Sequence, residues 1–243
     1  MNRPLDPSYH EWKTAQHSAG SPVTNAATVI ILRDHHDELE VLMLRRGAGA
    51  EFVGGMWVFP GGKIDPEDYD GTGDDLIAAA RNAAMRESME EASQSVDPNS
   101  MVWFSHWVPP QGAKFRFATF FFACRALHHS VTIDDFEIQD HAWLRPGDAL
   151  GQHRARAIQL APPTFVTLTY LARAHSVDEA LGAYGAREPR FYETQFAQTD
   201  QGMTFVWRPD AGYETKDLDA PGPRHRAVVT GEGWLFDDSG WPW

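Results

Sequence analysis

The passage from a Pro-Gly-Gly turn into an acidic helix constrains the fold of this chain more than any other feature. Residues 56–59 form a short apolar run that stops at Pro60-Gly61-Gly62. Residues 65–73 are rich in Asp and Gly and are typical of turns. A helix is then predicted from about Asp74, a residue that suits an N-cap, to about Ser93. Paired glycines before such a helix indicate backbone built for close approach to a phosphate or a metal.

The predicted helix displays three carboxylates on one side. Glu87, Glu90 and Glu91 stand at positions i, i+3 and i+4, so their side chains share one face. Carboxylates crowded in this way repel one another, and a hard cation such as Mg²⁺ or Mn²⁺ relieves the repulsion through oxygen ligands. Arg86 precedes Glu90 by four residues and can pair with it. A solvated acidic surface is the alternative interpretation, because such exposed helix faces are common.

The opposite side of this helix is predicted to face the core. Its apolar positions form a stripe along the helix: Ala78, Met85, Met89, Ala92 and Val96. In this interpretation the three glutamates point away from the core, so replacing them should leave the fold intact.

The remaining elements predict a mixed sheet covered by helices. Strands are predicted over residues 26–33, 40–46, 101–108, 115–127 and 138–144, and helices over residues 146–150, 162–174 and 176–184. Short strands return from residue 191 onward. This order predicts an α/β fold, with a mixed sheet between helices and a C-terminal extension. The predicted units are an N-terminal arm over residues 1–23, a main domain over residues 24–185 and a β-rich extension over residues 186–243, packed on that domain.

Composition excludes several classes of protein. Apolar residues make up 42% of the chain and charged residues 23%, which excludes wholesale disorder and a coiled coil. A single cysteine, Cys124, excludes an internal disulfide and a cysteine zinc site. The formal net charge of −13 argues against a general nucleic-acid binder. Without a signal-peptide pattern or an apolar run near the ~20 residues of a membrane span, we expect a cytoplasmic protein that binds no membrane.

The acidic helix and the glycine pair resemble the Nudix box, the signature G-x5-E-x7-R-E-U-x-E-E-x-G-U in which U is a bulky aliphatic residue. Gly62 matches the first glycine of that signature. Arg86-Glu87 and Glu90-Glu91 match its central part. The resemblance covers roughly residues 24–175.

The chain departs from this signature at several positions. Asp68 stands at the first glutamate position, and seventeen residues rather than seven separate it from Arg86. Ser88 and Ser93 replace the aliphatic residue and the second glycine. A lengthened box is similar to that of the (acyl-)CoA diphosphatase-like subgroup. A downstream Arg-Phe-Asp-Thr-Arg-Phe-Phe element of that subgroup is only partly matched, at residues 116–122.

The resemblance implies a Nudix-type α/β/α domain that uses Mg²⁺ or Mn²⁺ to hydrolyse a diphosphate bond in a nucleotide-linked substrate. It implies that Glu87, Glu90 and Glu91 hold the metal, and that Glu87 and Arg86 belong to the catalytic centre. The expected ligand is a small-molecule nucleoside diphosphate derivative, with CoA or acyl-CoA favoured. Cleavage of ADP-ribose or a dinucleotide is one alternative, and a non-catalytic nucleotide-sensing Nudix module is another. The residues that bind the substrate stay unassigned.

Several further residues have two readings. Glu137, in an acidic cluster before a predicted strand, could be the general base or an ordinary solvated turn residue. Arg45 and Arg46 could meet a substrate phosphate or lie on the surface, and Lys114 and Arg116 could supply positive charge for the 3′-phosphate of CoA. The C-terminal tryptophans could stack on a base, although packing on the domain or a homodimer interface is the favoured reading: Trp234, Trp241 and Trp243.

Overall fold

The computed structural model describes residues 23–50, 52–134, 136–199, 202–231 and 233–240. Most of the predicted N-terminal arm, together with Trp241 and Trp243, therefore lies outside the described residues. None of the helices in the described part of the chain is long and apolar enough to cross a bilayer.

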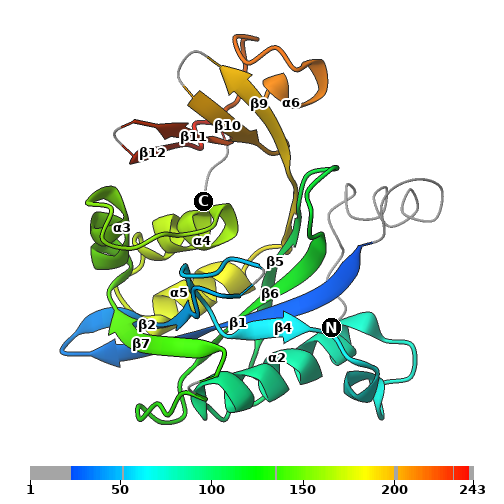
Figure 1. The fold of residues 1–243 in the computed structure, drawn as a ribbon, viewed down its shortest axis with the longest axis vertical. Coiled ribbons are helices and arrows are strands. Elements are labelled where there is room, and N and C mark those ends of the chain that lie inside the picture. The colour runs from blue at the N-terminus through cyan, green and yellow to red at the C-terminus, as the bar shows by residue number, and fades with distance from the viewer. Residues whose placement is uncertain (1–22, 51, 135, 200–201, 232, 241–243) are drawn as a thin grey trace.

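The first sheet has eight strands and mixed direction (Figure 1). Its path runs β3-β2-β1-β6-β5-β8, with β4 paired to β1 and β7 paired to β2. The pairs β1–β6 and β5–β8 are parallel and the others are antiparallel. The strands are β1 (Thr24–His35), β2 (Glu38–Arg46), β3 (Trp57–Val58), β4 (Gly61–Lys63), β5 (Val102–Val108), β6 (Phe117–Arg125), β7 (Ile138–Leu144) and β8 (Arg190–Glu193).

Local sequence explains the predicted hairpin. Successive side chains of β1 and β2 point to opposite faces of the sheet. The two strands are joined by a turn at His36 and Asp37, both of which have positive φ. Two such residues in succession give a tight turn whose twist matches that of paired strands. The glycine pair predicted to end a strand instead forms part of β4, which pairs with β1.

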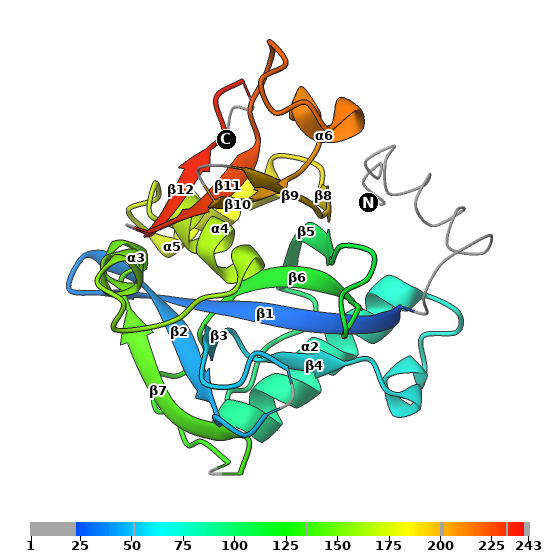
Figure 2. The same cartoon turned by 45° about the horizontal axis from the view of Figure 1, so that its top comes forward.

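Helices cover both faces of this sheet (Figure 2). On one face lies α2 (Leu76–Ala92), preceded by the 3₁₀ helix η1 (Pro66–Tyr69). On the other face lie α3 (Pro146–Arg154), α4 (Pro162–Leu171) and α5 (Val177–Gly185). Each face has its own core: Val29 and Ile31 of β1 pack with the alanines of α2, whereas Ile30 and Leu32 pack with α4 and α5. The predicted α/β fold with a mixed central sheet is thus present.

A second sheet forms the C-terminal extension. Its strands are β9 (Gln195–Thr199), β10 (Gly202–Val206), β11 (Arg226–Thr230) and β12 (Gly233–Asp237), in the order β12-β11-β10-β9, with the short α6 (Gly212–Thr215) between β10 and β11. Trp234 joins it to the first core through Phe165, 5.2 Å between ring centroids. This contact agrees with the predicted packing of Trp234 on the domain. The boundary at residue 185 stays a prediction, because β8 still belongs to the first sheet.

Candidate active site

The helix α2 buries a different side from the one predicted. Asp75 rather than Asp74 is its N-cap and accepts hydrogen bonds from the amides of Ile77 and Ala78. The apolar stripe was wrong at two of its five positions, since the side chains of Met85 and Met89 are exposed.

The side that faces the sheet instead carries small and polar residues: Ala79, Ala80, Ala83, Ala84, Ser88, Glu91 and Ala92. Small side chains let the helix approach the sheet closely. Close approach brings the carboxylate of Glu91, only 4% exposed, into reach of backbone from the sheet.

Two of the predicted carboxylates lie against the backbone of Gly61 and Gly62. The amide of Gly61 donates to Oε2 of Glu91 at 3.0 Å. A Cβ atom placed on Gly62 would lie 2.1 Å from Oε1 of Glu87, closer than any real contact. Because Gly62 has no side chain, the Glu87 carboxylate can lie directly against its backbone.

Arg86 connects the acidic residues of α2 with those of η1. Its guanidinium donates to both carboxylate oxygens of Asp68, at 3.1 and 2.9 Å. It also donates to Glu87 at 2.9 Å and to Glu90 at 3.0 Å, the second being the predicted i, i+4 pair. The hydrogen bonds to Asp68 are the main cause of the raised pKa of Arg86. Asp68 itself is only 5% exposed, so the lengthened segment still delivers a carboxylate to this arginine.

Arg46 of β2 connects Glu91 of α2 with Glu137. Its guanidinium lies 3.6 Å from Glu91 and 2.8 Å from Glu137. This pairing brings Glu137, the candidate base named from the sequence, to the same cluster as Glu91, and the link through Arg46 was not predicted. The neighbouring Arg45 pairs with Trp57 of β3, and the register between β2 and β7 shifts between Arg45 and Arg46. Lys114 lies over the Phe115 ring at 4.7 Å.

Comparison with known proteins fits this arrangement. A model of the NUDIX domain matches residues 23–163, more than half of the chain and every residue of the cluster. The chain belongs to the Nudix family. The putative nudix hydrolase 7 of Caenorhabditis elegans is similar, with 23% identity over 170 residues. That match spans 57% of this chain and 57% of the curated relative, so the chain covers little more than half of that protein's length.

A solved structure supports the fold. The crystal structure of a NUDIX hydrolase from Alicyclobacillus acidocaldarius covers 68% of this chain and 97% of its own, with a TM-score of 0.62 and 22% identity. At 22% identity, this similarity supports the fold and nothing further. It confirms the Nudix-type mixed α/β architecture predicted from the sequence.

Burial sets the electrostatics of the Nudix carboxylates. Burial raises the pKa of Glu91 to about 8, although the hydrogen bond from the Gly61 amide and the charge of Arg46 lower it, and the charges of Glu87 and Glu137 raise it further. Burial also raises the pKa of Glu87, against the lowering effect of Arg86. The surroundings of both carboxyl groups therefore disfavour the charged form. A nearby cation would favour the charged form of each.

The donor set of the cluster suits a hard divalent cation. All of its ligating atoms are carboxylate oxygens, which Mg²⁺ and Mn²⁺ prefer. Among the residues that the structure describes, no three His, Cys, Asp or Glu side chains already converge on one point. The carboxylates are turned toward Arg86 and Arg46 instead. They fit a cation in donor type and charge, and side-chain rotation would be needed to gather them around it.

Proposed function

We propose that this Nudix protein is a divalent-metal-dependent hydrolase of a diphosphate bond in a nucleotide-linked substrate. The observation that carries the proposal is the burial of Glu91 beside Glu87, against the Gly61-Gly62 backbone, with the pKa of both carboxyls raised. A structural ion pair needs one carboxylate for each arginine. Among the described residues, six carboxylates contact the two arginines Arg86 and Arg46: Asp65, Asp68, Glu87, Glu90, Glu91 and Glu137.

The proposed roles follow from these contacts. Glu87, Glu90 and Glu91 hold the cation, Mg²⁺ or Mn²⁺, which when bound neutralises phosphate charge and lowers the pKa of the attacking water. Arg86 fixes the orientation of Glu87 through the 2.9 Å hydrogen bond between them. Glu137 is about half exposed and held by Arg46, so it can reach solvent and accept a proton from the attacking water.

The favoured substrate is CoA or an acyl-CoA. The resemblance to the CoA diphosphatase-like subgroup motivates this choice, and an exposed aromatic group beside a lysine supports it. The Phe52 ring, 43% exposed, lies 4.9 Å from that of Phe117 and 6.0 Å from that of Phe115. Lys114 adds a positive charge over the Phe115 ring. Such a surface suits an apolar arm that carries a phosphate.

One assay separates the candidate functions. The protein is incubated with Mg²⁺ or Mn²⁺ and with CoA, acyl-CoA, ADP-ribose, NADH and dinucleoside polyphosphates, and the products are identified by mass. Release of 3′,5′-ADP from CoA, with dephospho-CoA about tenfold poorer in kcat/KM, supports the CoA assignment. Preferred cleavage of ADP-ribose or a dinucleotide transfers the function to the first alternative. Binding without turnover of any compound indicates a nucleotide-sensing module. Light scattering on the same preparation tests whether the protein is a homodimer.

A further inference from the structure

The two arginines of the acidic cluster are held in different ways. Arg86 donates two hydrogen bonds to the buried carboxylate of Asp68 and one to the carbonyl of Lys63, at 3.0 Å. These three bonds keep its guanidinium beside η1, whichever of its contacts with α2 are lost. In the described part of the chain, the Arg46 guanidinium contacts two carboxylates and no further group. Arg46 is therefore the arginine of the cluster that can change its partner most easily.

Arg46 holds its two carboxylates unequally. It donates to Oε2 of Glu137 at 2.8 Å, whereas its nearest approach to Oε1 of Glu91 is 3.6 Å, longer than a hydrogen bond. The Nε atom of Arg46 is buried, and no residue that the structure describes accepts a hydrogen bond from it. A buried donor without an acceptor costs free energy. The position that spans both carboxylates is thus not the most favourable one for this guanidinium, and the contact with Glu91 is the weaker of the two.

The backbone keeps Arg46 beside Glu137. The amide of Arg46 donates to the Met56 carbonyl at 3.0 Å, and its carbonyl accepts from the Gly55 amide at 3.1 Å. The amide of Gly47 donates to the Glu137 carbonyl at 2.8 Å. The register between β2 and β7 also shifts just before Arg46, and such irregularities redirect a side chain. The contact between Arg46 and Glu137 can therefore persist when the guanidinium leaves α2.

Glu91 has one oxygen that Arg46 and a cation would share. Its Oε2 atom accepts from the Gly61 amide at 3.0 Å, and its Oε1 atom faces Arg46. The side chain of Arg46 is 20% exposed and that of Glu91 is 5% exposed. Two positive groups on one carboxylate repel each other more strongly in such a site than in bulk water. Arg46 and a cation held by Glu91 therefore disfavour each other.

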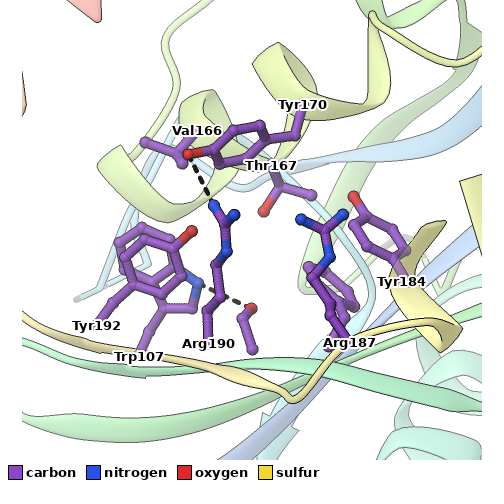
Figure 3. Close-up of a pocket in the computed structure, with 10 residues that line it drawn as sticks. Trp107, Val166, Thr167, Tyr170, Tyr184, Arg187, Arg190 and Tyr192 are labelled. Carbon is purple, nitrogen blue, oxygen red and sulfur yellow. Dashed lines mark hydrogen bonds between the residues drawn. The ribbon is translucent and has the colours of Figure 1, made fainter. Parts of the chain in front are cut away.

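The arginines on the opposite face of the sheet do not have this property. Arg190 donates to the Tyr170 hydroxyl at 3.0 Å, in a pocket lined largely by aromatic side chains (Figure 3). Arg187, which lines the same pocket, donates to the Ala183 carbonyl at 3.2 Å. These contacts are with neutral groups. The contacts of Arg46 are with carboxylates, one of which the proposed function assigns to the cation.

We propose that Arg46 is an internal competitor of the catalytic cation, and that it gives up Glu91 and keeps Glu137 when the cation binds. The proposal rests on the proposed function, which assigns Glu91 to the cation and the acceptance of a proton to Glu137. In the exchange, the 3.6 Å contact is lost and the 2.8 Å hydrogen bond remains. Arg46 then orients the Glu137 carboxylate alone. It is a positioning residue, because it acts on the reaction through Glu137.

Binding of Mn²⁺ to the full chain, measured from the EPR signal of the unbound ion, tests the proposal without substrate. The relevant site is the one that Glu91→Gln weakens. In Arg46→Gln the competing charge is gone, and we expect the Kd for Mn²⁺ at that site to fall by about tenfold or more. The reason is that Arg46 repels a doubly charged ion more strongly than it attracts the single charge of Glu91. With saturating Mn²⁺, kcat of the same variant should fall by about tenfold or more, because Glu137 is no longer oriented.

Two further variants separate this effect from a loss of charge or of structure. Arg46→Lys keeps the positive charge, so its Kd should stay within about threefold of that of the unchanged protein. Arg145→Gln removes an equal charge from an exposed arginine held by Glu38 and Asp148, and should leave both Kd and kcat unchanged. A purely structural role of Arg46 would weaken Mn²⁺ binding and lower kcat together. Opposite changes in affinity and kcat are specific to the proposed exchange.

The outcomes that overturn the proposal are distinct. If Arg46→Gln binds Mn²⁺ equally or more weakly, Arg46 is no competitor, and the hydrolase proposal stands without it. If the unchanged protein has no Mn²⁺ site that Glu91→Gln weakens, the metal-dependent function fails together with this inference. Should Arg46→Gln not fold, a crystal structure of the unchanged protein with Mn²⁺ decides the question. Arg46 must then keep Glu137 and lie beyond about 4 Å from Glu91, the limit of an ion pair, and an Arg46 still within that limit of a cation-bound Glu91 overturns the proposal.

Discussion

The two faces of the first sheet hold buried charge of opposite sign. On the α2 face, burial raises the pKa of Glu91 and Glu87. On the other face, burial lowers the pKa of Arg187 beside Arg190. In both places the surroundings disfavour the charged form of the side chains.

The partners of these charges differ between the two faces. The carboxylates are held by arginine side chains from β2 and α2 and by the Gly61 amide. The arginine side chains can rotate away and leave the carboxylates to a cation. The arginine pair is enclosed by stacked aromatic rings that leave room for one small group only. The comparison therefore predicts an adaptable cation site on the α2 face and a rigid, enclosed arginine pair on the other.

Replacement of Glu91 tests the first half of that comparison with the largest expected effect. Glu91→Gln keeps the shape of the side chain and an oxygen for the Gly61 amide, but removes the charge that would hold the cation. We expect kcat for diphosphate hydrolysis to fall by ~10²–10³, the scale of losing a main transition-state stabiliser. EDTA should abolish turnover of the unchanged protein.

The control for this variant is Glu67→Gln, an exposed acid of η1. It should leave kcat within about twofold of the unchanged protein. Unchanged turnover by Glu91→Gln, or full turnover in EDTA, would contradict the hydrolase proposal.

Gly62→Ala should have the next largest effect. The added methyl group would collide with the Glu87 carboxylate, which must then move away from the position it holds beside Arg86. The collision involves the end of a flexible side chain, so the melting temperature should change little. Activity with Mg²⁺ should fall at least ~10-fold, since small displacements of catalytic groups are costly. Gly49→Ala, with open space around its Cβ, should retain full activity, and equal rates for the two variants would show that the position of Glu87 is unimportant.

The extended elements could be predicted from the sequence because their signals are local. Residues 138–144 were predicted as a strand and form β7 with the same ends. The hairpin of β1 and β2 was also predicted, since alternation and a polar turn lie within one short stretch. The helix α3 is longer than predicted, Pro146–Arg154 against residues 146–150, because its second turn has a weak apolar pattern.

The buried side of α2 could not be predicted because its determinants are distant in sequence. Glu91 is compensated by the Gly61 amide and by Arg46, which are thirty and more residues away along the chain. The alanine pairs at residues 79–80 and 83–84 were the available signal for close packing. The pocket lined by Arg187 and Arg190 could not be predicted either, because its residues are spread along the chain from β5 to β8. The catalytic and metal-binding roles of Arg86 and the glutamates stay predictions.

The pH dependence of stability gives a smaller, signed test of the α2 face. The ordinary pKa of a glutamate is 4.5 and that of Glu91 in the fold is about 8, so the folded state binds more protons between these values. The contribution of Glu91 to stability is therefore present below pH 4.5 and is lost as the pH rises toward 8.

Urea denaturation in EDTA measures this contribution. Glu91→Gln should gain stability relative to the unchanged protein as the pH rises from 5 to 8, by roughly 3 to 4 kcal/mol at pH 8. Added Mg²⁺ should narrow the difference by stabilising only the protein that keeps the carboxylate. A difference that does not depend on pH would show that Glu91 is ionised throughout this range.

The smallest effect is expected from shortening the loop between η1 and α2. Residues 70–73 are turn residues, with Gly71 and Gly73 at positive φ, and only Thr72 is partly shielded from solvent. The hydrogen bond from Arg86 to Asp68 connects the two ends of the lengthened Nudix box, and Asp68 precedes this loop. Replacing residues 70–73 by two glycines should therefore keep the Asp68–Arg86 pair. It should change the free energy of unfolding by less than ~0.6 kcal/mol, the cost of doubling a flexible loop. Cation-dependent activity should not respond, although substrate preference can. Loss of folding in this variant would show that the loop helps to position α2. The α2 face of the first sheet would then depend on the loop between η1 and α2, which the opposite face does not contain.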